Sequence, residues 1–132
     1  MPIRTKRWDD PKDPADGFRL LVCHYRPRGL PRDQQTWDDW DINLSPSKEL
    51  HAAAYGKNGQ IRIAWESYRR AFLQEMLRQK PALKKLAARS LAGETITLLC
   101  SSACAREHRC HRSLLRDLIN AEADSQKKIP DD

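Results

Sequence analysis

The sequence predicts a single α/β domain, in which a small, partly parallel central sheet is flanked by helices. Two short apolar runs, Phe18–Cys23 and Thr95–Cys100, have the length of buried strands. Apolar residues recur at helical spacing between these runs and again after the second one, as far as Ile119. Strands that alternate with helices are typical of α/β folds. The 132 residues are enough for one core, which we place in residues 1–122, with residues 123–132 as a polar tail that is expected to fray.

Three helices precede the second strand in this prediction. The first, Pro46–Tyr55, begins in a Ser-Pro-Ser sequence that suits a helix start and ends at Gly56. The longest, Ile63–Gln79, carries an aromatic and apolar stripe at helical spacing. The third begins at Pro81, which breaks the helix before it, and ends at Gly93.

Less regular segments surround the first strand. Pro2–Arg7 holds one apolar residue among basic ones and is expected to form a short edge strand, and Asp9–Gly17 reads as a surface loop. Trp37 and Trp40 lie three residues apart and are expected to share one face of a helical turn. Such a pair packs in a core or an interface more often than it stacks on nucleic-acid bases, so packing is the favoured interpretation.

The composition is typical of a globular protein with a heavily charged surface. Hydrophobic residues make up 39% of the chain and charged residues 32%, which is too apolar for a chain disordered throughout. No apolar run has the length of a membrane span, and the N-terminal sequence has no apolar signal-peptide core, so we expect a cytoplasmic protein without a membrane partner. The net charge of +6 and the pI near 9.4 fit either a merely basic surface or an anionic partner, such as a nucleotide or nucleic acid.

Two groups of basic residues are candidates for contact with an anion. Arg26 and Arg28 follow the first strand and suit a phosphate or a carboxylate equally. They would otherwise pair with an acidic run nearby, which consists of Asp33, Asp38, Asp39 and Asp41. The second group is a candidate phosphate-backbone patch, although most such runs are simply solvated faces; it consists of Arg78, Lys80, Lys84, Lys85 and Arg89.

The loop after the second strand concentrates cysteine, histidine and arginine, and the residues leave four interpretations open. In the first, Cys100 is a thiol nucleophile, because five residues separate it from Arg106, as in loops that wrap an oxyanion. Such cradles usually need glycines, and this loop has none. In the second, the loop binds zinc, although its spacing is not the paired C-x-x-C form; the ligands would come from Cys100, Cys104, His108, Cys110 and His111.

The other two interpretations need no thiol or metal chemistry. If Cys110, His111 and Arg112 open the last helix, the free amides and the positive end of the helix dipole would attract a phosphate or carboxylate. Alternatively, the cysteines are small buried residues, and His111 and Arg112 hold the loop together by hydrogen bonds.

A set of short motifs covers nearly the whole chain, from about Ile3 to Ile119. The motifs are the basic start with Asp-Pro at Arg4–Pro11, Asp16-Gly17-Phe18-Arg19, Arg26-Pro27-Arg28-Gly29-Leu30, Trp40, Ser45-Pro46-Ser47-Lys48-Glu49-Leu50, Trp65 with Tyr68, and Thr97-Leu98-Leu99. Taken in this order, they resemble domain-of-unknown-function family 488, and in particular its YeaO-like branch.

The resemblance implies a small cytosolic bacterial α/β domain and assigns no catalytic role to any residue. The chain departs from the YeaO-like pattern at His24-Tyr25, where an Asp-Arg-Leu-Trp type of stretch is usual, and in Cys100–His111, which is richer in cysteine. Its Cys110-His111-Arg112 instead resembles the Cys-His-Arg ending of other members of the wider family. These departures favour an anion or nucleic-acid site built on arginines over a cysteine-dependent activity common to the branch.

Together these observations give one hypothesis for a site, at the edge of the sheet where the carboxyl ends of both strands would meet. A phosphate-bearing ligand, either a nucleotide or a nucleic acid, would be bound there by Arg26, Arg28, Ser101, Cys110 and Arg112. His111 would transfer protons if there is catalysis, which the sequence leaves open, and Cys100 is the second candidate catalytic residue. The site uses no metal, and no cofactor is indicated. The alternative is a cysteine-dependent enzyme or a small zinc-binding protein that uses Cys100, Cys104, Cys110 and His111.

Overall fold

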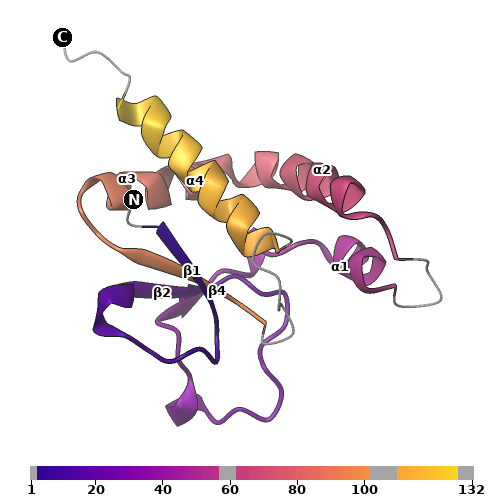
Figure 1. Ribbon diagram of the computed structural model, residues 1–132, viewed down its shortest axis with the longest axis horizontal. Coiled ribbons are helices and arrows are strands. Elements are labelled where there is room, and N and C mark those ends of the chain that lie inside the picture. Colours follow the sequence, from indigo (N-terminus) through magenta and orange to yellow (C-terminus); the bar gives the residue numbers. More distant parts are fainter. Residues whose placement is uncertain (1–2, 57–61, 102–109, 128–132) are drawn as a thin grey trace.

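Figure 1 shows the computed structural model, which describes residues 3–56, 62–101 and 110–127. The strands are β1 (Ile3–Arg7), β2 (Phe18–Leu21), β3 (Asp39–Trp40) and β4 (Ile96–Cys100). The helices are α1 (Lys48–Tyr55), α2 (Trp65–Met76), α3 (Lys80–Leu91) and α4 (His111–Lys127). Short 3-10 turns lie at Pro14–Asp16, Arg32–Gln34, Ile42–Leu44 and Leu77–Gln79. The predicted α/β class is confirmed.

The strands form one sheet in the order β1-β4-β2-β3, and every pairing in the described part of the chain is parallel. Ile96 of β4 lies opposite both Ile3 of β1 and Phe18 of β2. All five residues of β4 are buried, as expected for a central parallel strand that is covered on both faces. The predicted edge strand is confirmed as β1, and the two strands predicted from apolar runs are neighbours.

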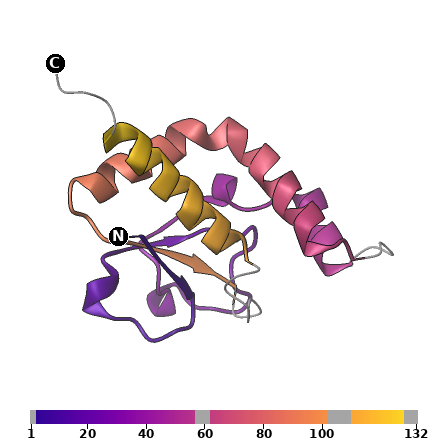
Figure 2. The ribbon, with the colours of Figure 1, turned by 45° about the horizontal axis from the view of Figure 1, so that its top comes forward.

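Helices α2, α3 and α4 lie on one side of the sheet (Figures 1 and 2), where α4 packs against α3 and crosses β1 and β4. The main core lies between this layer and the sheet, and Phe72, Leu98, Leu115 and Ile119 are fully buried in it. Burying such side chains is the chief source of stability for the domain.

A second, smaller cluster lies at the carboxyl end of the central strands. Leu21 and Leu99 belong to it, whereas their neighbours Leu20 and Leu98 belong to the main core, since successive strand residues point to opposite faces. The other buried members are Cys23, Trp37, Cys100 and Cys110, and Trp8, Leu30 and Trp40 pack against it. We call this set the edge cluster.

Helix α1 begins two residues later than predicted. Ser47, not Ser45, is the N-cap: its Oγ accepts from the Leu50 amide at 3.1 Å, whereas the Ser45 hydroxyl donates to the Ile42 carbonyl at 2.6 Å. The predicted end of α1 at Gly56 is confirmed, with φ +68° at the glycine.

Trp37 and Trp40 do not share a helical turn, so that prediction is wrong. The backbone of this segment pairs with β2 instead: the Asp38 amide donates to the Arg19 carbonyl at 2.7 Å, and Leu21 lies opposite Trp40. Packing of the pair is confirmed, because Trp37 is buried and Trp40 packs against the edge cluster.

The last helix is longer than predicted. Helix α4 continues to Lys127, so the first five residues of the predicted polar tail are helical. Ala123 is fully buried in the main core, and Gln126 Nε2 donates to the Lys84 carbonyl at 3.2 Å. Small and polar residues hid this docking, because they weaken the apolar stripe on which the sequence prediction depended.

Candidate functional site

The carboxyl ends of β1, β4 and β2 lie side by side and form one edge of the sheet. Arg7 pairs with Cys100, and Leu21 pairs with Leu99. Backbone bonds extend this edge, because the Trp8 amide donates to the Cys100 carbonyl and the Val22 amide to the Leu99 carbonyl. Ligands of open α/β sheets bind at such an edge.

His111, the first residue of α4, is tied to this edge through its ring. Its Nε2 lies 2.7 Å from the Val22 carbonyl oxygen. Because a carbonyl can only accept, Nε2 carries the proton, and the basic nitrogen of the neutral ring is Nδ1. Nδ1 lies 3.8 Å from Cys110 Sγ. The geometry therefore directs the proton-accepting side of His111 toward the Cys110 thiol.

Of the two predicted cysteines in this part of the chain that the structure describes, Cys100 and Cys110, it is Cys110 whose thiol lies beside the His111 ring. Both thiols are buried in the edge cluster, but Cys100 Sγ contacts the Ser101 carbonyl at 3.6 Å. Ser101 itself is half-buried and directly follows β4. Cys104, together with Arg106 and His108, lies outside the described residues, so neither the oxyanion cradle nor the full zinc set is visible.

Arg112 lies buried in the first turn of α4. It is 5% exposed, and no residue that the structure describes accepts a hydrogen bond from its Nε. The charge of Arg112 acts on the carboxyl group of Asp10, whose pKa is lower than usual. The main cause is a hydrogen bond from the Arg7 amide, which burial of the carboxyl partly opposes. The charge of Arg7 and, more weakly, that of Arg112 lower the pKa further. Arg112 thus carries a buried donor without an acceptor among the described residues.

Arg26 is held in place after β2 by two contacts. Its Nη1 donates to the Leu30 carbonyl at 2.8 Å, and its guanidinium carbon lies 5.5 Å from the centre of the Trp37 ring. Its Nη2 is buried and has no hydrogen-bond partner in residues 3–56, 62–101 and 110–127. Arg28, by contrast, is exposed at the turn that contains Gly29, whose φ is +72°.

The pairing of Arg26 and Arg28 with the nearby acidic run, one of the two alternatives, is not found among the described residues. The acidic residue with several ion pairs is instead Asp16, just before β2, which contacts Arg4, Lys6 and Arg19. The arginines at or near the carboxyl edge that make no ion pair in the described structure are Arg26, Arg28, Arg32 and Arg112.

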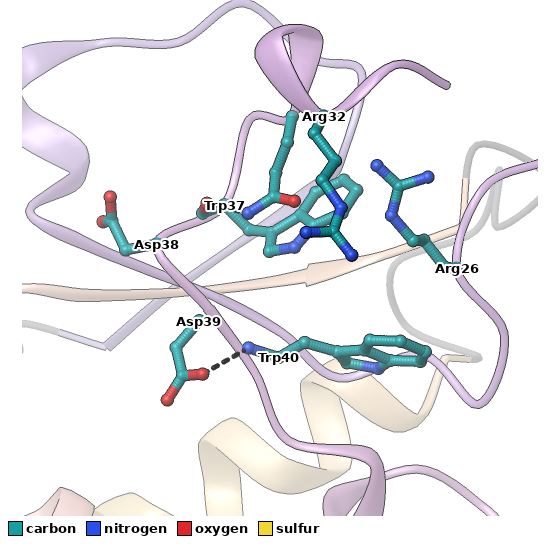
Figure 3. A pocket seen from close by; sticks show the side chains of 7 residues that line it. Arg26, Arg32, Trp37, Asp38, Asp39 and Trp40 are labelled. Carbon is teal, nitrogen blue, oxygen red and sulfur yellow. Dashed lines mark hydrogen bonds between the residues drawn. The ribbon is translucent and has the colours of Figure 1, made fainter. Parts of the chain in front are cut away.

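A pocket of about 490 Å³ opens beside the edge cluster (Figure 3). Arg32 and Arg26 lie toward one end of it, above the indole of Trp40, and Asp38 and Asp39 stand toward the other. The complete lining is Arg26, Arg32, Gln35, Trp37, Asp38, Asp39 and Trp40. Sequence reasoning noted the tryptophan pair but missed the pocket, because its residues come from a loop, a 3-10 turn and a two-residue strand with no shared periodicity.

A second feature that the sequence did not suggest is an aromatic group between the end of β2 and α1. The ring of His24 lies 4.6 Å from that of Tyr25, and His51 lies 5.4 Å from Tyr25 and 4.8 Å from Tyr55. His51 and Tyr55 are four residues apart on α1, which was the only available signal.

The second basic group is partly neutralised. Arg89 forms two hydrogen bonds to Glu94 and lies over the Phe18 ring, and Lys80 lies 3.7 Å from Glu122. Its remaining members, Arg78, Lys84 and Lys85, are exposed. The structure thus gives this group the character of a solvated face.

The described residues contain no group of three or more His, Cys, Asp or Glu side chains arranged to hold a metal ion. None of their helices combines the length and the apolar character that crossing a membrane requires.

Comparison with known proteins places the chain among bacterial relatives. Residues 3–123 match the family model described as the active DUF488-N3 subclade. The chain is 33% identical over 87 residues to the uncharacterized protein YeaO of Escherichia coli K12, covering 66% of this chain and 72% of YeaO. It is 30% identical over 120 residues to the uncharacterized protein Rv3073c of Mycobacterium tuberculosis H37Rv, covering 89% of this chain and 93% of the relative. No solved structure matches it.

Proposed function

The chain belongs to domain-of-unknown-function family 488, in its YeaO-like branch, and we propose that the carboxyl edge of its sheet binds a phosphate-bearing ligand, a nucleotide or a nucleic acid. The ligand residues are Arg26, Arg28, Ser101, Cys110 and Arg112, with His111 beside them. We also propose that the protein acts in the cytoplasm.

One observation carries the proposal: within the described part of the chain, Arg112 Nε and Arg26 Nη2 are buried without an acceptor. Arginine is charged at every physiological pH, and a buried charged donor without a partner is costly. A phosphate at the edge would supply both the negative charge and the acceptor oxygens.

The position of Arg112 adds to this argument. It occupies the first turn of α4, where the helix dipole favours an anion. Four arginines at or near this edge (Arg26, Arg28, Arg32 and Arg112) make no ion pair in the described structure, so their charges remain available to an anionic ligand.

The test is ligand-induced thermal stabilisation of the reduced protein, with inorganic phosphate, pyrophosphate, mononucleotides and short oligonucleotides. A ligand at about 100 times its Kd should stabilise the folded state by about 2.7 kcal/mol. The stabilisation should fall as salt rises. Arg112→Gln and Arg26→Gln should each reduce it.

The matched control is Arg70→Ala, which also removes one positive charge but from the exposed face of α2. Each variant is compared with its own ligand-free Tm, so a loss of intrinsic stability does not count as a loss of binding. No stabilisation by any phosphate-bearing compound, or an equal effect of all three substitutions, would refute the proposal.

The contact between Cys110 and His111 supports a second candidate function, a cysteine-dependent reaction. His111 Nδ1 is oriented to accept the thiol proton and so to generate a thiolate nucleophile. If so, Cys110 should be alkylated by iodoacetamide well below pH 8.5, and His111→Gln should shift that reaction to higher pH. Alkylation only upon unfolding would identify Cys110 as a buried structural residue.

A further inference from the structure

We propose that the pocket lined by Trp37, Trp40, Arg26 and Arg32 is the subsite for the base of a nucleotide, with a preference for bases that carry an exocyclic amino group. This inference rests on the proposed function for the phosphate, but the pocket can be tested by itself with nucleosides.

The pocket has the size and the walls that a planar ring requires. Its volume of about 490 Å³ lies within the range of small-molecule sites, about 300–1,000 Å³. Trp40 is half-buried, and its Nε1 donates to the Cys23 carbonyl at 2.7 Å, which fixes the plane of the indole. Trp37 is buried and packs edge-to-face on Trp8, with ring centres 6.4 Å apart. Nucleobases stack on such fixed aromatic rings.

The cationic end of the pocket suits the phosphate of the same ligand. Arg26 is held by Leu30 and Trp37, whereas Arg32 is exposed and makes no ion pair or side-chain hydrogen bond in the described structure. Both guanidinium groups lie over the side of the pocket that contains the Trp40 ring (Figure 3). Arginine at this position can bind phosphate oxygens and also stack on the base.

The acidic end suits hydrogen-bond donors on the base. Asp38 Oδ2 accepts from the Arg19 amide and Asp39 Oδ1 from the Trp40 amide, both at 2.8 Å. These bonds orient the carboxylates and leave the second oxygen of each able to accept. Gln35 Nε2 donates to the Trp37 carbonyl, which leaves its side-chain oxygen as a further acceptor. Adenine, cytosine and guanine have amino groups to donate, whereas uracil has a carbonyl oxygen where cytosine has its amino group.

The same charges disfavour other occupants. A basic peptide would be repelled by Arg26 and Arg32, and an acidic peptide by Asp38 and Asp39. A nucleotide suits both ends of the pocket, because its anionic phosphate can bind the arginines and the amino group of its neutral base can donate to the carboxylates. A purely apolar ligand would leave the charged groups of the lining without partners.

The experiment is a set of titrations followed by tryptophan fluorescence and calorimetry. The probes are adenosine, guanosine, cytidine and uridine, their 5′-monophosphates, ribose 5-phosphate and inorganic phosphate. Amino-bearing nucleosides should quench the fluorescence and bind more tightly than uridine. A short single-stranded oligonucleotide, compared with the mononucleotide, distinguishes a free nucleotide from a nucleic-acid strand as the source of the base.

Two kinds of variant test the named contacts. Trp40→Leu removes the stacking ring and should weaken nucleoside binding about 5- to 150-fold, whereas Tyr55→Leu, which removes an exposed aromatic ring on α1, should leave it unchanged. Asp38→Asn with Asp39→Asn retains acceptors for the backbone amides but should reduce the preference over uridine.

The outcomes separate this inference from the proposed function. Binding of phosphate without binding of nucleosides would overturn the base subsite and leave the phosphate site standing. Binding of nucleosides without any contribution from phosphate would overturn the phosphate site and leave the base subsite standing. Equal binding of all four nucleosides, or no effect of Trp40→Leu, would overturn the amino preference or the stacking contact respectively.

Discussion

At the scale of single residues, Asp16 shows how this chain uses its positive charge for structure. Its carboxylate is fully buried just before β2, where it forms ion pairs with Arg19, with Lys6 at 2.8 Å and with Arg4 at 3.4 Å. Its backbone carbonyl accepts from Thr97 Oγ1 at 2.7 Å. Burial by itself would raise the pKa of Asp16, but hydrogen bonds and charges, chiefly from Lys6, outweigh it and hold the pKa below its usual value.

Gly17 completes this arrangement. Its φ is +64°, and a Cβ at this position would lie 2.2 Å from the Thr95 carbonyl oxygen. The Phe18 amide donates to that same oxygen at 2.9 Å. The glycine in the Asp16-Gly17-Phe18-Arg19 motif is therefore explained by the close approach of the backbone before β2 to the backbone before β4.

Asp16→Asn should destabilise the protein by about 3–5 kcal/mol at neutral pH, because the buried charge of Arg19 loses its counter-charge. Since folding lowers the pKa of Asp16, the contribution of the carboxylate is complete above the unfolded value near 3.9 and is lost as the pH falls through the lower folded value. Urea denaturation from pH 7 to pH 2.5 measures this.

The difference between wild type and Asp16→Asn should therefore shrink in acid. Asp33→Asn, which changes an exposed carboxylate in the 3-10 turn Arg32–Gln34, is the control and should change stability little at any pH. A constant difference across the pH range would contradict the role of the ionised carboxylate.

At the scale of elements, the start of α1 is fixed by a residue far away in the sequence. Glu75 of α2 accepts through Oε1 from the Ser47 amide at 2.8 Å, and through Oε2 from the Ser47 hydroxyl. Ser45 and Ser47 look equivalent in the sequence, because both are potential caps followed within a few residues by Glu49. The choice between them depends on α2, and local pattern cannot supply it.

Ser47→Ala should lower the free energy of unfolding by about 0.5–2 kcal/mol, because the Leu50 amide loses its acceptor. Chemical denaturation checks the value, and Ser67→Ala, at an exposed site in the first turn of α2 where the serine is not the N-cap, is the control. In a double-mutant cycle with Glu75→Gln the two changes should not add, because they share one bond. Strict additivity would show that Glu75 does not act through Ser47.

Elements with a long apolar pattern were predictable, and short ones were not. β2 and β4 follow from continuous apolar runs, and α2 from its stripe through Tyr68 and Phe72. β3 has only two residues, so no alternation can indicate it. The predicted meeting of β2 and β4 at one edge is confirmed, but the direction of the His111 proton depends on the Val22 carbonyl and could not be predicted.

At the scale of the whole molecule, the basic residues divide into those that form ion pairs and those that do not. Asp16 pairs with Arg4, Lys6 and Arg19, whereas Arg26, Arg32 and Arg112 make no ion pair in the described residues. The net charge of +6 gave no information about this division. Which arginines are available to a ligand is a property of the tertiary structure, and it separates Arg112 from Arg19, although both are buried.

The order of the sheet also predicts how much of the chain is needed to fold. β1 pairs only with β4 in the described structure, so a fragment of residues 1–94 should lack a partner for β1 and should unfold without cooperativity in urea. A chain ending at residue 127, which retains β4 and α4, should unfold cooperatively and is the control. Cooperative unfolding of the shorter fragment would contradict this expectation.

This placement of β4 has a consequence for biosynthesis. During synthesis, β1 cannot pair with β4 until the segment that begins at Ile96 has emerged from the ribosome. Until then the edges of β1 and β2 that β4 will fill are open to strands of other chains. The first 95 residues are therefore synthesised before the strand that pairs with both β1 and β2 is available.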